Sequence, residues 1–276
     1  MFHDTRASRR DRQVYQPVNA PLILREDRGD VAVIMLNRPH QRNALTYASW
    51  TELAAALDEL TGVSGVVLAG SAGFFCAGGD LKSGPAHGDG AMGPAGRVEL
   101  AQRVMEKLRG LPMPTISAVE GAAVGLGWSL ALCCDLVVCA SDAFFAAPFV
   151  ARAVVPDGGL AWRFTQQLGR HRAASLLLRG NRIPAAEAER LGLVTEVVTP
   201  GSAIDAAVQL AAELAGADAG AVEMTKRLIN SAENAQLAAF HPLELAMATV
   251  AQQRSAAATG RQAFGQDPQR DSAGQA

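Results

Sequence analysis

Two glycine-rich segments have the composition needed to present backbone N–H groups to an anion. The first, Phe74-Phe-Cys-Ala-Gly-Gly-Asp-Leu-Lys82, follows an apolar run, and its paired glycines let the backbone approach a ligand without interference from Cβ atoms. The second, Glu120-Gly-Ala-Ala-Val-Gly-Leu-Gly-Trp128, opens a helical pattern whose N-terminal N–H groups and dipole favour negative charge. Two such donors predict an oxyanion hole, a site that stabilises a developing negative oxygen.

Both segments resemble the signature of the crotonase (enoyl-CoA hydratase/isomerase) superfamily. The resemblance implies an α/β fold, the crotonase-like ββα superhelix with a helical C-terminal region, and an acyl-CoA thioester as substrate. It places the two oxyanion-hole donors on the backbone N–H groups of Gly79 and Leu126. Further matching segments extend the resemblance over roughly residues 20 to 265: Leu36-Asn-Arg-Pro39, Asn43-Ala-Leu45, Val155-Pro-Asp-Gly-Gly159 and Thr225-Lys-Arg-Leu-Ile-Asn230.

The resemblance also implies where the rest of the substrate lies. It predicts that Ala44 and the stretch Gly78, Asp80 and Leu81 line the path of adenine and pantetheine. A basic side chain, from Arg38, Arg42 or Lys82, would meet the CoA phosphates. Three neighbouring aromatic residues are either walls of an apolar acyl pocket or plain core: Phe144, Phe145 and Phe149.

The sequence departs from the family at the residues that activate water. Hydratases of this family use two glutamates, one in the helix after the second glycine turn and one about twenty residues later. Ser129 and Phe149 occupy those positions here. Neither side chain can act as a carboxylate base, so hydration by the two-glutamate mechanism is not expected.

Asp157 is the carboxylate that the resemblance leaves for proton transfer. It matches the acidic residue of some enoyl-CoA isomerases and of the ring-opening epoxyphenylacetyl-CoA isomerases. One base suffices to move a double bond, and apolar neighbours would raise its pKa. The competing interpretation is structural, because an Asp before Gly-Gly and a helical run is a natural N-cap. Asp80, Asp135 and Glu120 are rival carboxylates, with hydrogen-bonding roles in family motifs favoured for the first two.

The sequence therefore predicts an acyl-CoA isomerase that needs no metal or redox cofactor. Hydration with an unusual base and a CoA-ester binding protein with little catalysis are the alternatives. A serine hydrolase is disfavoured, because Gly127-Trp-Ser-Leu-Ala131 lacks the last glycine of a nucleophile elbow and no partner histidine is identifiable.

Bulk composition limits the partners. A formal net charge of −2 gives no basic surface for nucleic acid, and the apolar runs are too short or too glycine-rich to span a membrane. The four cysteines contain no C-x-x-C pair and suit reduced core thiols in the cytoplasm. By resemblance we expect a homo-oligomer, a trimer or a dimer of trimers.

Short apolar runs alternate with helical patterns along the chain. Strands are expected at 31–36, 66–69, 115–119 and 136–140, and helices at 47–60, with Thr46 as N-cap, 96–109 and 125–134. After residue 158 helices are expected at 160–168, 171–179, 184–191, 202–215, 219–234 and roughly 242–258, and Ser202 with Asp205 has the spacing of a capping box. We divide the chain into a flexible leader (1–19), an α/β core (20–200), a helical trimerisation region (201–265) and a loose tail (266–276).

Overall fold

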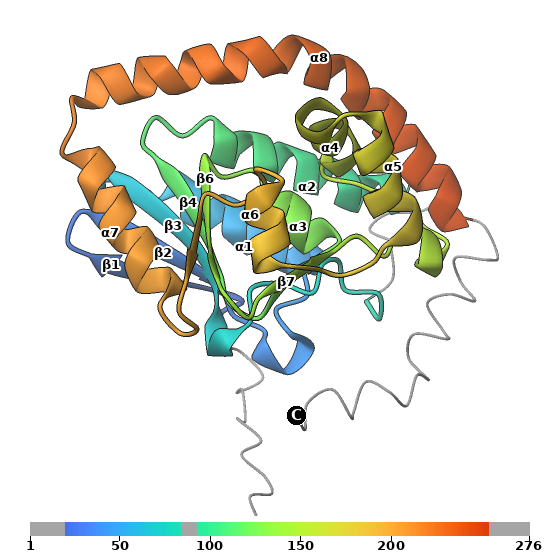
Figure 1. Ribbon diagram of the computed structural model, residues 1–276, viewed down its shortest axis with the longest axis horizontal. Helices are drawn as coiled ribbons and strands as arrows, with labels where there is room; N and C mark the ends of the chain where they lie inside the picture. Colours follow the sequence, from blue (N-terminus) through green and yellow to red (C-terminus); the bar gives the residue numbers. More distant parts are fainter. Residues whose placement is uncertain (1–19, 84–92, 254–276) are drawn as a thin grey trace, which may run out of the picture.

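The computed structural model describes residues 20–83 and 93–253 of the chain (Figure 1), so the predicted leader and tail lie outside the described residues. The strands are β1 (Ile23–Arg28), β2 (Val31–Leu36), β3 (Gly65–Gly70), β4 (Thr115–Val119), β5 (Ala122–Val124), β6 (Leu136–Ala140), β7 (Phe144–Ala146), β8 (Ile183–Pro184) and β9 (Glu196–Val198). The α-helices are α1 (Tyr47–Asp58), α2 (Gly93–Arg109), α3 (Leu126–Ala131), α4 (Leu160–Leu168), α5 (Arg170–Arg179), α6 (Ala185–Arg190), α7 (Ala203–Ala215) and α8 (Ala219–Gln253). Short 3₁₀ turns are η1 (Pro39–Gln41), η2 (Ser71–Gly73) and η3 (Val150–Arg152).

The main sheet has six strands in the order β1-β2-β3-β4-β6-β9. β1 pairs antiparallel with β2, and the remaining pairs are parallel. Parallel strands need crossover connections, and helices that cover both faces bury the central strands β3 and β4 completely. This explains why the predicted strands are continuous apolar runs rather than alternating patterns.

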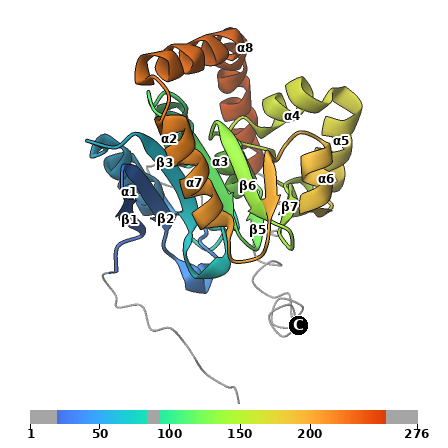
Figure 2. The same ribbon diagram turned by 60° about the vertical axis from the view of Figure 1, so that its left-hand side comes forward.

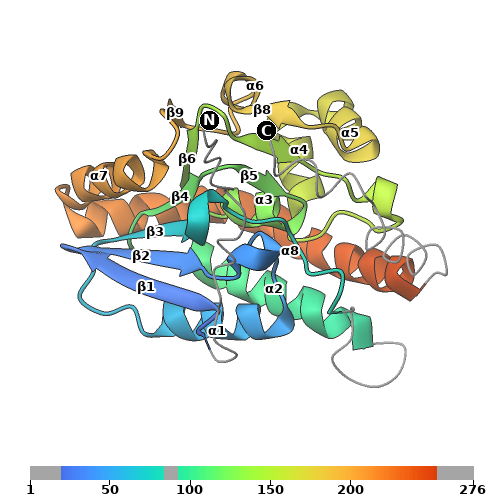
Figure 3. The ribbon, with the colours of Figure 1, turned by 90° about the horizontal axis from the view of Figure 1, so that it is seen from below.

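Alternate residues of each strand face different helices. Ile34 and Leu68 belong to the core beneath α1, α2 and α3, whereas Val33 and Val67 belong to the core beneath α7. The buried residues of α7 are the alanines Ala203, Ala207 and Ala211, so this helix can approach the sheet closely. Figure 3 shows α1 and α2 on one side of the sheet and α7 on the other.

A second sheet, β5-β7-β8, was not expected from the sequence. Its strands have two or three residues, too few for a periodic signal. Figure 2 shows α4, α5 and α6 gathered at this end of the molecule. β5 leads directly into α3, so the small sheet fixes the second glycine-rich turn.

Most predicted helices are confirmed, with ends shifted by a few residues. Thr46 caps α1 as expected, with reciprocal hydrogen bonds to Ser49. The expected capping box of Ser202 and Asp205 is wrong, because Ser202 makes no side-chain cap bond and Asp205 pairs with Arg28 at 2.6 Å. The N–H of Ala203 instead donates to the carboxylate of Glu120 at 2.9 Å, so a residue distant in sequence caps the helix.

The two C-terminal helices expected on either side of Pro242 form one helix, α8. A proline inside a helix removes one backbone donor and bends it. Figure 1 shows that α8 changes direction part-way along its length. The helix is tied to α2 and its following loop by an Arg109–Glu233 ion pair (2.8 Å) and a hydrogen bond from Lys226 to the Met113 carbonyl (2.7 Å).

Candidate active site

The first predicted donor, the N–H of Gly79, points away from Leu45, with which Gly79 forms an isolated parallel bridge. Leu45 donates to the Gly78 carbonyl at 2.8 Å, and Asp80 donates to the Leu45 carbonyl at 2.8 Å. In a parallel bridge the residue between these bonds turns its own N–H to the other side. Within the described part of the chain, no acceptor is recorded for the Gly79 N–H.

The second predicted donor, the N–H of Leu126, begins α3. The segment before it is aligned with the first turn, because Val124 donates to the Cys76 carbonyl at 2.9 Å. Gly125 has φ +56° and turns the chain into the helix. An N–H at a helix start has no partner within its own helix, and no described residue accepts this one.

Two glycines allow the donor segments to lie against each other. A Cβ atom on Gly78, which has φ +94°, would stand 2.6 Å from the Val124 carbonyl oxygen and 3.3 Å from the Leu126 nitrogen. A Cβ atom on Gly127 would stand 2.5 Å from the Cys76 carbonyl oxygen. The close approach of the two backbones therefore requires glycine at both positions, and it brings the two predicted donors to one pocket.

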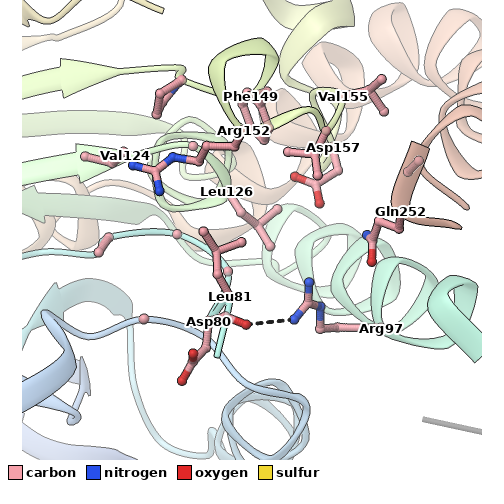
Figure 4. A pocket seen from close by; sticks show the side chains of 18 of the residues that line it. Asp80, Leu81, Arg97, Val124, Leu126, Phe149, Arg152, Val155, Asp157 and Gln252 are labelled. Atoms are coloured by element: carbon pink, nitrogen blue, oxygen red, sulfur yellow. Dashed lines mark hydrogen bonds between the residues drawn. The ribbon is translucent and has the colours of Figure 1, made fainter. Parts of the chain in front are cut away.

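The pocket contains most of the predicted substrate-binding residues (Figure 4). Ala44, Gly78, Asp80, Leu81, Lys82 and Phe149 all line it, together with Gly79 and Leu126. Phe144 and Phe145 are not among the lining residues; Phe145 is fully buried in the core.

Arg38 and Arg42 do not line the pocket. Arg38 holds Asp80 through an ion pair of 2.9 Å and donates to the Ala44 carbonyl at 2.5 Å. Arg42 lies 5.9 Å from the centre of the Phe74 ring. Of the three basic residues predicted to bind the CoA phosphates, Lys82 is the one that lines the pocket. A contact of Arg38 with CoA stays a prediction.

Asp157 also lines the pocket, and its Oδ1 atom is buried with no hydrogen-bond partner. Figure 4 shows its carboxylate and the guanidinium of Arg97 pointing into the same space. Burial, followed by repulsion from Glu244, raises the pKa of Asp157 to about 7, and Arg97 opposes the rise. A half-buried residue with an unsatisfied carboxylate oxygen in a pocket is suited to exchange protons near neutral pH.

The structure does not support Asp157 as a helix cap. The N-cap of α4 is Gly159, and no side chain of its own segment caps the helix. The Gly159 N–H donates instead to Oε1 of Glu244 at 2.8 Å. The stabilising role proposed for the Asp157 side chain is thus filled by a residue of α8.

The rival carboxylates have structural partners, as expected for Asp80 and Asp135. Asp80 accepts from the N–H of Lys82 at 2.9 Å; burial raises its pKa, but the hydrogen bonds and Arg38 outweigh this, so the pKa lies below its usual range. Asp135 accepts from Thr115 and pairs with Lys226 at 2.6 Å. Glu120 caps α7. Asp157 is left as the pocket carboxylate with an unengaged oxygen.

Sequence reasoning missed several residues of the site. Arg97 lines the pocket from α2 and donates to the Asp80 carbonyl at 3.2 Å. Arg152, Ala248 and Gln252 also line it, the last two from α8. None lies in a glycine motif, and their positions depend on tertiary packing, so no local signal identifies them. Among the described residues no cluster could hold a metal ion.

Two backbone donors beside one carboxylate with an unengaged oxygen form an arrangement that can stabilise an enolate of a carbonyl compound. The chain belongs to the enoyl-CoA hydratase/isomerase family, the crotonase superfamily, whose model matches residues 26–270. It is a crotonase-family enzyme acting on acyl-CoA thioesters. Of the described helices, none has the length and apolarity that a membrane span requires.

The relatives share most of the chain. A "Probable enoyl-CoA hydratase" of Rhizobium meliloti is 36% identical over 211 residues, covering 75% of this chain and 80% of the relative. The 2,3-dehydroadipyl-CoA hydratase of Escherichia coli is 34% identical over 214 residues, covering 76% and 82%. A solved enoyl-CoA hydratase from Mycobacterium avium subsp. paratuberculosis has a TM-score of 0.80 at 27% identity, covering 89% and 100%. The predicted crotonase-like α/β fold is confirmed.

Proposed function

We propose that this protein is an acyl-CoA isomerase that moves a double bond with Asp157 as its single base. The observation that carries the proposal is the buried, unpartnered Oδ1 of Asp157 in the pocket that also contains Gly79 and Leu126. A base that must accept and return a proton needs a pKa near the working pH, and burial raises that of Asp157 to about 7.

The proposed reaction starts from a 3-enoyl-CoA thioester. Its carbonyl oxygen accepts hydrogen bonds from the N–H groups of Gly79 and Leu126. Asp157 removes a proton from the carbon next to the carbonyl, and the electron pair delocalises over the double bond and the thioester oxygen. Asp157 then returns the proton to the far end of the former double bond, giving a 2-enoyl-CoA. The two N–H groups stabilise the dienolate more than the substrate, which lowers the barrier.

Hydration is the second candidate, favoured by the names of the relatives in Rhizobium and Escherichia coli. The two glutamate positions argue against the usual mechanism. Ser129 is fully buried and its hydroxyl donates to the Asp157 carbonyl at 2.9 Å, while Phe149 brings an apolar ring to the pocket. Hydration would therefore have to use Asp157 alone.

We further propose that the protein forms a homo-oligomer, a trimer or a dimer of trimers, through α8. The support is a set of exposed apolar side chains on this helix, which cost free energy in water and are typical of interfaces. They are Met224, Leu228, Ile229, Leu243, Met247 and Val250. A cytoplasmic location is part of the same proposal, supported by four buried, free cysteines.

The test compares the purified protein with Asp157→Asn on 3-enoyl-, 2-enoyl-, 2,3-dehydroadipyl- and epoxyphenylacetyl-CoA thioesters, with products identified by mass spectrometry and NMR. Double-bond migration that falls by about 10²-fold or more in the variant is expected. Equal activity in the variant rejects Asp157 as the base. Water addition without migration would establish the second candidate, and binding without turnover would leave a CoA-ester binding protein.

A further inference from the structure

Glu244 of α8 lies behind the turn that carries Asp157. Glu244 is only 4% exposed, and both of its carboxyl oxygens accept hydrogen bonds. Oε1 accepts from the Gly159 N–H at 2.8 Å, and Oε2 accepts from Nε2 of Gln102 on α2 at 2.9 Å. Burying a carboxylate costs free energy unless its oxygens are hydrogen-bonded. The Glu244 carboxylate has a donor from the turn before α4 and another from α2.

The turn itself is held in an unusual backbone conformation. Gly158 and Gly159 have φ +66° and +75°, a region that side chains disfavour. A Cβ atom on Gly158 would stand 2.8 Å from Cβ of Ser129, so the turn is packed tightly against α3. The hydroxyl of Ser129 on α3 donates to the carbonyl of Asp157, and Glu244 on α8 accepts from the N–H of Gly159, so two helices hold the turn.

Glu244 is not placed to act on substrate. It does not line the pocket, and its two oxygens are occupied by donors. It therefore cannot replace a missing glutamate that positions water. Its influence must pass through Asp157, which is two residues from the N–H that Glu244 binds.

The charges around the two carboxyl groups come from three helices. Arg97 of α2 faces Asp157, while His241 of α8 and Arg163 of α4 face Glu244. Burial raises the pKa of Glu244 above its usual value, and the hydrogen bonds from Gln102 and Gly159 offset only part of that rise. An ionised Glu244 repels a negative charge on Asp157, and burial of both groups reduces the screening of this repulsion by water.

We infer that Glu244 is a positioning residue of the active site: it holds the Asp157 turn through the Gly159 N–H and places a second buried carboxyl group behind that turn. The inference rests on the proposed function in that the base is Asp157. It makes α8 part of the catalytic machinery rather than only a surface for assembly.

The experiment is an NMR titration of the full-length protein with ¹³C-labelled aspartate, in which the Asp157 signal is assigned by its loss in Asp157→Asn. Glu244→Gln keeps the shape of the side chain and an acceptor for Gly159, and the amide of Gln102 can turn to face it. This variant removes the charge alone. We expect the pKa of Asp157 to fall by about one to two units. The acid limb of kcat/KM for double-bond migration should move to lower pH by the same amount.

Glu233→Gln is the matched control, because it removes a negative charge from the same helix at a residue that pairs with Arg109. It should leave the Asp157 titration unchanged. An unchanged Asp157 pKa in Glu244→Gln, or an equal shift in the control, overturns the inference. Wild-type protein gives a second test without substitution: two coupled carboxyl groups titrate in two steps, so the Asp157 signal should show a second inflection when Glu244 ionises. A single inflection near pH 4 contradicts the inference.

Failure of the proposed function has a different signature. If double-bond migration does not depend on Asp157, the base is elsewhere, yet the titration still reports whether Glu244 acts on the Asp157 turn.

Discussion

The hydroxyl of Ser129 donates a hydrogen bond of 2.9 Å to the backbone carbonyl of Asp157. By the sequence resemblance, Ser129 occupies the position where hydratases of this family carry a glutamate. The same position that presents a carboxylate to water in those enzymes therefore holds the turn of a different carboxylate here. Ser129 therefore lacks the carboxylate of those enzymes and instead anchors the turn that carries Asp157.

Ser129→Ala should lower the free energy of unfolding by about 1 kcal/mol, the usual net value of one hydrogen bond. It should also reduce kcat for migration, because the turn that positions Asp157 loses one anchor. Ser117→Ala is the matched control: Ser117 is equally buried, on β4, but its hydroxyl has no partner. Urea denaturation and steady-state kinetics measure both effects. Equal losses in the two variants would contradict a specific role for the Ser129 bond.

The main sheet could be predicted from the sequence because its strands are buried on both faces. Val31 to Leu36 and Leu136 to Ala140 are unbroken apolar runs, and both are strands with those bounds. β1 was missed because Arg25, Glu26 and Asp27 lie in it, and an edge strand with polar residues has no apolar signal. Local composition identifies central strands and fails at the edges.

The residues of the candidate site also fall into those that local sequence predicts and those that it does not. The donors of Gly79 and Leu126 could be predicted because backbone geometry depends on nearby glycines. Glu244 and Arg97 could not, since each reaches the site from a helix that is brought there by packing. Glu244 is 85 residues from the N–H that it binds.

Gly78→Ala should reduce kcat by about 10²-fold or more, the loss seen when one oxyanion-hole donor is displaced. The new Cβ atom would stand 2.6 Å from the Val124 carbonyl oxygen, so the two backbone segments must separate. Gly62→Ala is the control, because Gly62 also has a left-handed backbone (φ +68°) but no atom within 4 Å of the added Cβ. Both variants should lose stability, while the control keeps its kcat. A full kcat in Gly78→Ala would remove this turn from the proposed oxyanion hole.

Leu228→Asp should shift the protein toward monomers, since Leu228 is 74% exposed on α8 and a charge there opposes burial in an interface. Leu178→Asp places the same charge at a 66% exposed leucine on α5. Analytical ultracentrifugation gives the mass of each species. A trimer or hexamer in the wild type that persists in Leu228→Asp, or that is lost equally in Leu178→Asp, would exclude α8 as the specific interface.

Asp157→Asn should make the protein more stable above neutral pH while it abolishes migration. The pKa of Asp157 is raised from 3.8 to about 7 in the folded state, chiefly by burial and then by Glu244, so the unfolded chain loses this proton more readily than the folded one. The resulting penalty on folding is absent below about pH 4, grows between pH 4 and 7, and is complete above pH 7. A rise of three pKa units corresponds to about 4 kcal/mol at most. Asparagine has no charge to bury, so the stability difference between variant and wild type should grow over this window. Urea denaturation at pH 4.5 and pH 8 measures it, and a difference that does not change with pH would mean that Asp157 titrates normally and is not tuned as a base.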